Sequence, residues 1–316
     1  MTTRPLARLG AIPPIYFVLV AVIVLAALVS DRFLSPANVV TVLQQGVITG
    51  TVALGMTLVL IGGHFDLSTG ATVTMAAVLA LLLNPADAGG TVLAIGIPLL
   101  AGGAIGLING LVVCRGGANS IVATIAMQFI LMGAVLALVG GQHVRTETLS
   151  DAFWFLSNGR VAGLPMPVIL FAALVAGLSV LLGNTVFGRH LYAVGGDPEA
   201  ARRCGVPVVR RGVTAFVICG VLAALAGVLV ASRVGHLDPS GVGRYEFPAL
   251  TAAVLGGVSL SGGVGRPLDT AAAILVVAVM TNVMTLLNIG YSSQLLVQGV
   301  VLALAVAFYA HRRGES

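Results

Sequence analysis

Lysine is absent from this chain of 316 residues, and charged residues of every kind make up only 9% of it. Soluble domains usually carry about 25% charged residues, so the composition excludes an ordinary soluble fold. The common phosphate-binding loop, Gly-x-x-x-x-Gly-Lys-Ser/Thr, requires a lysine, so the chain contains no nucleotide site of that type. If ATP drives its work, another subunit must bind the ATP.

Cysteine is also scarce: Cys114, Cys204 and Cys219 are far apart and lack the spacing of a metal site or a disulfide framework. The sequence shows no Ser–His arrangement or cluster of metal ligands at helical spacing, which argues against a membrane-embedded enzyme. We therefore expect no catalytic residue, no metal and no cofactor. The net charge of +5 is carried by arginine. Arginine near span ends sets membrane topology, so we expect no nucleic-acid partner.

Apolar residues are what the chain has in abundance: 58% of it is hydrophobic, and the mean hydropathy is +1.07. The apolar runs are continuous, whereas those of a β-barrel alternate. Because a membrane helix needs roughly 20 apolar residues, the sequence predicts an all-α, polytopic membrane protein, one domain over residues 1–316 with about ten spans. The predicted spans are residues 12–30, 39–61, 67–83, 91–113, 120–140, 164–183, 212–232, 247–261, 268–287 and 293–310.

The distribution of arginine predicts that both termini are cytoplasmic, because basic residues concentrate in cytoplasmic loops. With ten spans, the larger set of arginines lies inside: Arg4, Arg8, Arg115, Arg189, Arg202, Arg203, Arg210, Arg211, Arg266, Arg312 and Arg313. The smaller set lies outside: Arg32, Arg145, Arg160, Arg233 and Arg244. This arrangement also places the polar loop between the sixth and seventh spans in the cytoplasm.

That loop contains the stretch "AVGGDPEAARRCGVPVVRRG", which predicts a short, well-delimited helix from Pro198 to Cys204. Asp197 suits the N-cap position, proline suits the first helical position, and Gly205 suits the left-handed position after the last turn. So short a helix is marginal alone in water. We expect it to dock on a partner, with Ala200 and Ala201 as a small-residue face. A loop that merely connects two spans is the plainer alternative.

Two other segments share a Gly-Gly and then a Leu-Ser pattern: "VLIGGHFDLSTG" at 59–70 and "AVLGGVSLSGG" at 253–263. The similarity of the two segments has two possible origins: an internal duplication, or the packing of small residues without duplication. Asp66, in the first segment, is either a functional carboxylate or, as we favour, the N-cap of a helix that starts at Leu67. The second segment predicts close packing or a helix break near a cytoplasmic gate. Its glycines are Gly256, Gly257, Gly262 and Gly263.

Uncharged polar side chains inside the predicted spans need partners in lipid, so most should face the bundle or a pore. They are Gln44, Gln45, Asn109, Gln128, Asn282 and Gln298. Bonding between helices accounts for such residues most simply. As residues that line a translocation path, we favour Gln44, Gln45 and Asn282.

Taken together, these segments resemble ABC import permeases of the ribose/xylose type. "FGRHLYAVGGDPEAARRCGV" (187–206) is similar to the family's cytoplasmic loop, in which Glu-Ala-Ala, three residues and Gly form the coupling helix that docks on the ATPase. "IGGHFDLSTGATV", "NSIVATIAMQFILMGAVLALVGG" and "FPALTAAVLGGVSLSGGVG" also match, in the same order. His64-Phe65 before Asp66 is one residue longer than the family pattern. The resemblance assigns coupling, within a loop at 188–211, to Gly196, Asp197, Pro198, Glu199, Ala200, Ala201 and Gly205.

The resemblance implies a type II ABC importer in the plasma (inner) membrane. Two permease chains, alike or different, would pair with ATPase subunits and receive sugar from an extracytoplasmic sugar-binding protein. A permease for nucleosides or branched-chain amino acids is an alternative within the same class. An ion-coupled secondary transporter is disfavoured, because such proteins use intramembrane carboxylates and the deep spans lack them apart from Asp66 and Asp269.

Overall fold

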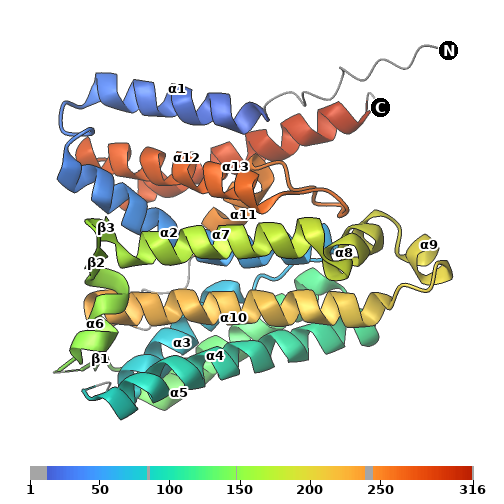
Figure 1. Cartoon of the computed structure of the whole chain (residues 1–316), viewed down its shortest axis with the longest axis horizontal. Helices are drawn as coiled ribbons and strands as arrows, with labels where there is room; N and C mark the ends of the chain where they lie inside the picture. The colour runs from blue at the N-terminus through green and yellow to red at the C-terminus, as the bar shows by residue number, and fades with distance from the viewer. Residues whose placement is uncertain (1–12, 84–85, 147, 239–244, 315–316) are drawn as a thin grey trace.

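The computed structural model describes residues 13–83, 86–146, 148–238 and 245–314, which form a bundle of helices (Figure 1). The first helices are α1 (Pro14–Val29), α2 (Pro36–Ile61), α3 (Thr69–Leu82), α4 (Ala88–Gly110), the π-helix η1 (Leu111–Arg115), α5 (Ser120–Val139) and α6 (Asp151–Asn158). Then come α7 (Met166–Asn184), α8 (Val186–Gly196), α9 (Pro198–Arg203), α10 (Val208–Val234), α11 (Glu246–Leu255), α12 (Pro267–Leu286) and α13 (Tyr291–Gly314).

Two short antiparallel ladders close the end of the bundle opposite α9. Strand β1 (Val144–Arg145) pairs with β4 (His236–Leu237), and β2 (Arg160–Val161) pairs with β3 (Leu164–Pro165). In Figure 1 these strands and α6 lie at one end of the long helices, and α9 projects from the other.

Six helices in the described part of the chain are long and apolar enough to cross a membrane: α2, α4 with η1, α5, α7, α10 and α12. Four shorter apolar helices, at 14–29, 69–82, 246–255 and 292–304, lie at the remaining predicted positions. The protein is thus a multi-pass membrane protein, as expected, while the number of ten crossings stays a prediction.

Helix α10 is the centre of the bundle and packs against α2, α3 and α4. Its contact with α4 depends on glycines at every fourth residue of α4. A Cβ atom on Gly106 would overlap the backbone of Phe216, and one on Gly110 would lie 2.8 Å from the Cα of Val213. Small residues at this spacing let two backbones approach closely in lipid. This packing holds α10 closely against α4, so the segments at its two ends are attached to a well-packed helix.

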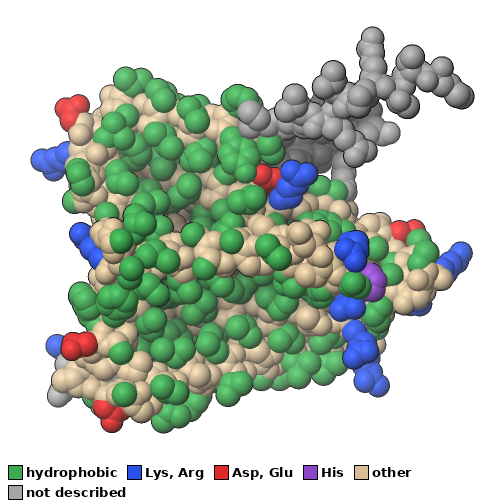
Figure 2. All heavy atoms as spheres, viewed as in Figure 1, with side chains coloured by type: hydrophobic (Ala, Val, Ile, Leu, Met, Phe, Trp, Pro, Cys, Tyr) green, Lys and Arg blue, Asp and Glu red, His purple; other side chains and the backbone are tan. Residues whose placement is uncertain are grey.

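Figure 2 shows the arginine side chains toward the two ends of the molecule, with a largely hydrophobic surface between them. That distribution is what a bilayer-spanning bundle requires, because charge in the hydrocarbon layer is costly. Arg4, Arg8 and Arg244, which the orientation argument counts, lie outside the described residues. The cytoplasmic placement of both termini stays a prediction.

Candidate functional site

The short helix predicted in the polar loop is present as α9, with both ends formed as expected. The Asp197 carboxylate accepts hydrogen bonds at 2.9 Å from the backbone N–H groups of Glu199 and Ala200, and Pro198 occupies the first helical position. Gly205 has a φ of 79°, and the N–H group after it bonds back to the Ala201 carbonyl at 3.0 Å. The last helical residue is Arg203, one residue earlier than predicted.

The side chains of α9 divide into an inward and an outward set. Ala201 is only 5% exposed, so it faces its own protein, contrary to the expectation that both alanines form one outer face. Ala200 and Glu199 are exposed. Glu199 pairs with Arg202 at 2.9 Å and Arg203 at 3.5 Å. Because these pairs are exposed, each contributes only about 0.3–0.5 kcal/mol to the helix, and they remain available to a partner.

Helix α8 connects α9 to the bundle and is itself firmly held. Leu191 is fully buried. At the foot of α10, Arg211 donates from Nε to the His190 Nδ1 atom at 3.2 Å and stacks over the Phe187 ring at 5.9 Å. Helix α8 is therefore fastened to α10 and contacts α9.

Five glycines from three separate segments meet where α8 leads into α9, and we call them the glycine junction. They are Gly63 after α2, Gly195 and Gly196 at the end of α8, and Gly262 and Gly263 between α11 and α12. A Cβ atom on Gly262 would lie 2.5 Å from the Gly195 carbonyl oxygen and 2.9 Å from the Cα of Gly63. The lack of a side chain at Gly195, Gly262 and Gly263 permits this approach, whereas a Cβ atom on Gly196 would meet no atom within 4 Å.

Hydrogen bonds fasten the same three segments. The Gly263 N–H group donates to the Ile61 carbonyl at 2.9 Å, and the Tyr192 hydroxyl of α8 donates to the Gly265 carbonyl at 2.7 Å. A Cβ atom on Gly195 would overlap the Ile61 carbonyl oxygen. The end of α2, the end of α8 and the α11–α12 loop thus form one closely packed unit beside α9.

The repeated Gly-Gly pattern of the sequence forms the same turn at both places. Gly63 after α2 has a φ of 81°, and Gly257 after α11 has a φ of 83°. In each case the next N–H group bonds to a carbonyl five residues back, at 3.1 and 3.0 Å, which is a Schellman ending. The helix break expected here is confirmed, and α11 ends at Leu255 rather than at residue 261.

Asp66 lies in the loop between α2 and α3 and is 2% exposed. Helix α3 starts at Thr69, two residues later than the predicted start at Leu67. The side chain of Asp66 still makes the bond expected of a cap, because its Oδ1 atom accepts from the Ser68 N–H at 3.0 Å. The same atom accepts from the Ser68 hydroxyl at 2.6 Å and from the Asn109 amide at 3.5 Å. Burial raises the pKa of this carboxyl, and the hydrogen bonds oppose that shift.

The residues that depart from the family pattern, His64 and Phe65, lie against the protein. The His64 ring packs against the Phe216 ring with centroids 5.9 Å apart, and burial lowers the pKa of its imidazole. The Phe65 N–H group donates to the Ser120 hydroxyl at the start of α5, at 3.1 Å. The longer loop is thereby tied to α10 and α5.

Gln44, Gln45 and Asn282, favoured for a translocation path, do not line the cavity described below. Gln44 is half-buried and Gln45 is exposed on α2. Asn282 is 4% exposed and exchanges two 2.9 Å amide hydrogen bonds with Asn38. These two hydrogen bonds join α12 to α2. Bonding between helices, the simpler explanation for a polar residue in a span, thus accounts for Asn282.

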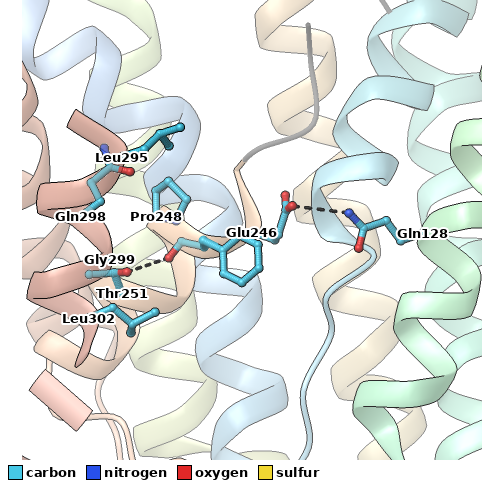
Figure 3. A pocket seen from close by; sticks show the side chains of 9 residues that line it. Gln128, Glu246, Pro248, Thr251, Leu295, Gln298, Gly299 and Leu302 are labelled. Carbon is cyan, nitrogen blue, oxygen red and sulfur yellow. Dashed lines mark hydrogen bonds between the residues drawn. The ribbon is translucent and has the colours of Figure 1, made fainter. Parts of the chain in front are cut away.

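A cavity of about 460 Å³ lies elsewhere, between α5, α11 and α13 (Figure 3). Its polar lining residues are Gln128, Glu246, Thr251 and Gln298. Glu246 is 4% exposed and was missed, because in the sequence it borders a polar loop. Its nearness to the predicted eighth span was the only available signal. Glu246 is therefore a buried acidic residue near the deep spans in addition to Asp66 and Asp269, contrary to the expectation.

The chain matches known proteins over most of its length. Residues 38–306 match the family described as "Branched-chain amino acid transport system / permease component". The ribose import permease protein RbsC of Escherichia coli strain K12 is 33% identical over 293 residues, which cover 91% of each chain. RbsC of Bacillus subtilis strain 168 is 34% identical over 286 residues, 90% of this chain and 88% of its own.

A third relative is the L-arabinose ABC transporter permease protein AraH of Azospirillum brasilense, 36% identical over 283 residues, 90% of this chain and 83% of its own. No solved structure matches. The resemblance to ABC permeases that the loop motifs indicated is thus confirmed over nearly the whole chain. By this match, the chain belongs to the family of branched-chain amino acid transport system permease components.

Proposed function

We propose that this chain is the membrane-spanning permease subunit of an ATP-driven sugar importer, and that α9 couples it to a separate ATPase. The single observation that carries the coupling role is α9 itself: a helix with both ends capped whose Ala200 and Glu199 are exposed. A six-residue helix gains little stability alone, so its exposed, capped form suits a fitted partner surface. The relatives named for ribose and arabinose import support a sugar as the substrate.

The glycine junction gives the proposal a route for mechanical work. Protein interiors are close-packed and resist compression, so a displacement of α8 by the ATPase reaches the end of α2 and the α11–α12 loop directly. A cytoplasmic gate would lie in the α2–α3 loop and the α11–α12 loop. These two loops contain the residues predicted for it: Asp66, Gly256, Gly257, Gly262 and Gly263. The gate lies in this unit.

The remaining partners follow from the same class of transporter. A second permease chain, identical or related, completes the path across the membrane, and an extracytoplasmic sugar-binding protein delivers the solute. ATP hydrolysis belongs to the partner ATPase, since this chain contains no lysine and so no lysine-containing phosphate loop. Both termini and α9 face the cytoplasm.

Cysteine crosslinking tests the coupling role. With exposed Cys204 replaced by alanine, Ala200→Cys should crosslink to a nucleotide-binding subunit in native membranes. The matched control is Ala152→Cys, on the exposed side of α6 at the other end of the bundle, which should not crosslink to that subunit. An unlinked Ala200→Cys, or labelling of α9 from outside the cell, contradicts the proposal.

Two alternatives remain distinct. Branched-chain amino acids are named in the family description, so the substrate class must be measured and not assumed. An ion-coupled transporter gains some support from the buried Glu246, but Asp269 accepts a hydrogen bond from the Tyr16 hydroxyl at 3.0 Å and Asp66 is held by its neighbours. Uptake that persists after ATP depletion with the ion gradients intact would favour that alternative.

A further inference from the structure

The cavity between α5, α11 and α13 is lined by hydrogen-bonding groups from all three helices (Figure 3). The Gln128 amide of α5 donates to the Glu246 carboxylate of α11 at 3.4 Å. Five residues further along α11, the Thr251 hydroxyl donates to the Phe247 carbonyl at 2.8 Å, which leaves its oxygen able to accept. Gln298 of α13 faces the same space.

These groups lie at middle depth of the bundle. Gln128 is eight residues beyond Ser120, where α5 begins, which is about 12 Å along the helix. Gln298 is seven residues beyond Tyr291, where α13 begins, which is about 10 Å. Because α5 and α13 start at opposite faces in the predicted topology and the hydrocarbon layer is about 30 Å thick, both side chains are near its centre.

Polar groups at that depth are costly in lipid, so they either pair between helices or mark functional positions. The other lining residues, Phe247, Pro248, Leu295, Gly299 and Leu302, give the cavity an apolar wall. Amide, carboxylate and hydroxyl groups beside apolar surface suit a solute that carries several hydroxyls on a carbon ring. The volume of about 460 Å³ is within the range of small-molecule sites.

We propose that this cavity is a transient binding site for a neutral, polyhydroxylated solute on its way through the membrane, with Gln128, Glu246 and Thr251 as its polar contacts. The inference rests on the proposed function and adds to it the place where the solute binds. It also replaces Gln44, Gln45 and Asn282 as the residues that contact the solute.

Uptake in native cells that carry chromosomal variants tests the site. The probes are radiolabelled D-ribose, D-xylose, L-arabinose and D-galactose, with L-leucine as the amino acid. Gln128→Leu and Thr251→Val should each lower uptake of the transported sugar about threefold to tenfold, the effect of one lost hydrogen bond. The matched control, Gln45→Leu on the exposed side of α2, should leave uptake unchanged. Membrane abundance is measured for each variant.

A second measurement covers the case in which a variant folds poorly. In a chain with Cys114→Ala and Cys204→Ala, the transported sugar should slow alkylation of Gln128→Cys by N-ethylmaleimide and leave that of Gln45→Cys unchanged. Normal uptake in both cavity variants, or no protection of Gln128→Cys, overturns the proposed site. Failure of the proposed function has a different signature: deletion of the gene leaves uptake of all four sugars unchanged.

Discussion

Two short helices flank α10 at its opposite ends, and they are held in different ways. Helix α6 is fastened to α10: Phe153 is fully buried, Ser157 donates to the Leu229 carbonyl at 2.7 Å, and Ser232 donates to the Phe153 carbonyl at 2.6 Å. In α9, by contrast, Ala201 is the buried residue, and the hydrogen bonds of Asp197 stay within the segment.

The difference shows two ways to stabilise a helix that is too short to be stable alone. Burial of an aromatic ring holds α6 and leaves little free surface on that side. Caps at both ends hold α9 and leave its charged outer side open. A helix that is held by its caps, as α9 is, is suited to transient contact with a partner. Its exposed side can bind without breaking contacts to the rest of the protein.

The largest effect is expected from a substitution that removes the buried anchor of α6. Phe153→Ala should destabilise the protein by about 3–5 kcal/mol, since it removes a large buried side chain and leaves a cavity. The measurement is the thermal midpoint of unfolding in detergent, together with the amount of protein in the membrane. Trp154→Ala, at the half-exposed neighbour, is the control and should change both far less. Equal losses would show that α6 is not anchored through Phe153.

A middle-sized effect concerns the link between α9 and the bundle. Gly195→Ala places a Cβ atom on the Ile61 carbonyl oxygen, and overpacking of this kind costs about 1–3 kcal/mol. We expect a clear loss of sugar uptake with partial retention of the ATPase activity of the complex. Gly196→Ala is the matched control, because its Cβ atom would meet no atom within 4 Å. Normal uptake by Gly195→Ala would remove the glycine junction from the coupling route.

The smallest effect compares the two caps directly. Asp197→Ala and Ser150→Ala each remove an N-cap worth about 1 kcal/mol, from α9 and α6 respectively. Because α6 is also held by burial, only Asp197→Ala should lower sugar-dependent ATP hydrolysis, and Asp197→Asn should restore it. Hydrolysis is measured in reconstituted importer with the binding protein present. If Ser150→Ala has the same effect as Asp197→Ala, the contrast between the helices is not functional.

Local features of the site were predictable because they depend on neighbours in sequence. Asp197, Pro198 and Gly205 specify α9 through its own backbone N–H and carbonyl groups, so no other part of the chain is needed. The helix break after Leu255 follows in the same way from the left-handed conformation of Gly257. The start of α3 was predicted two residues early, since Asp66 makes its shorter hydrogen bonds with Ser68, in the turn before the helix.

The contacts between distant segments could not be predicted from one sequence. Asn282 looked suited to a pore, yet its amide group is hydrogen-bonded to Asn38, more than 240 positions away in the chain. Ala201 looked equivalent to Ala200, yet the rotation of α9 on α8 turns it inward. Glu246 gave almost no signal, because its burial depends on α5 and α13 closing around it.

The sequence by itself determined that the chain spans a membrane, where its long apolar helices lie and that α9 is a short helix capped at both ends, since hydropathy and capping act over one helix or less. Only the tertiary structure decided which glycines meet, which polar groups pair and where a cavity remains. Those outcomes depend on the distances between backbones of separate helices, and such distances are fixed by the packing of the whole bundle.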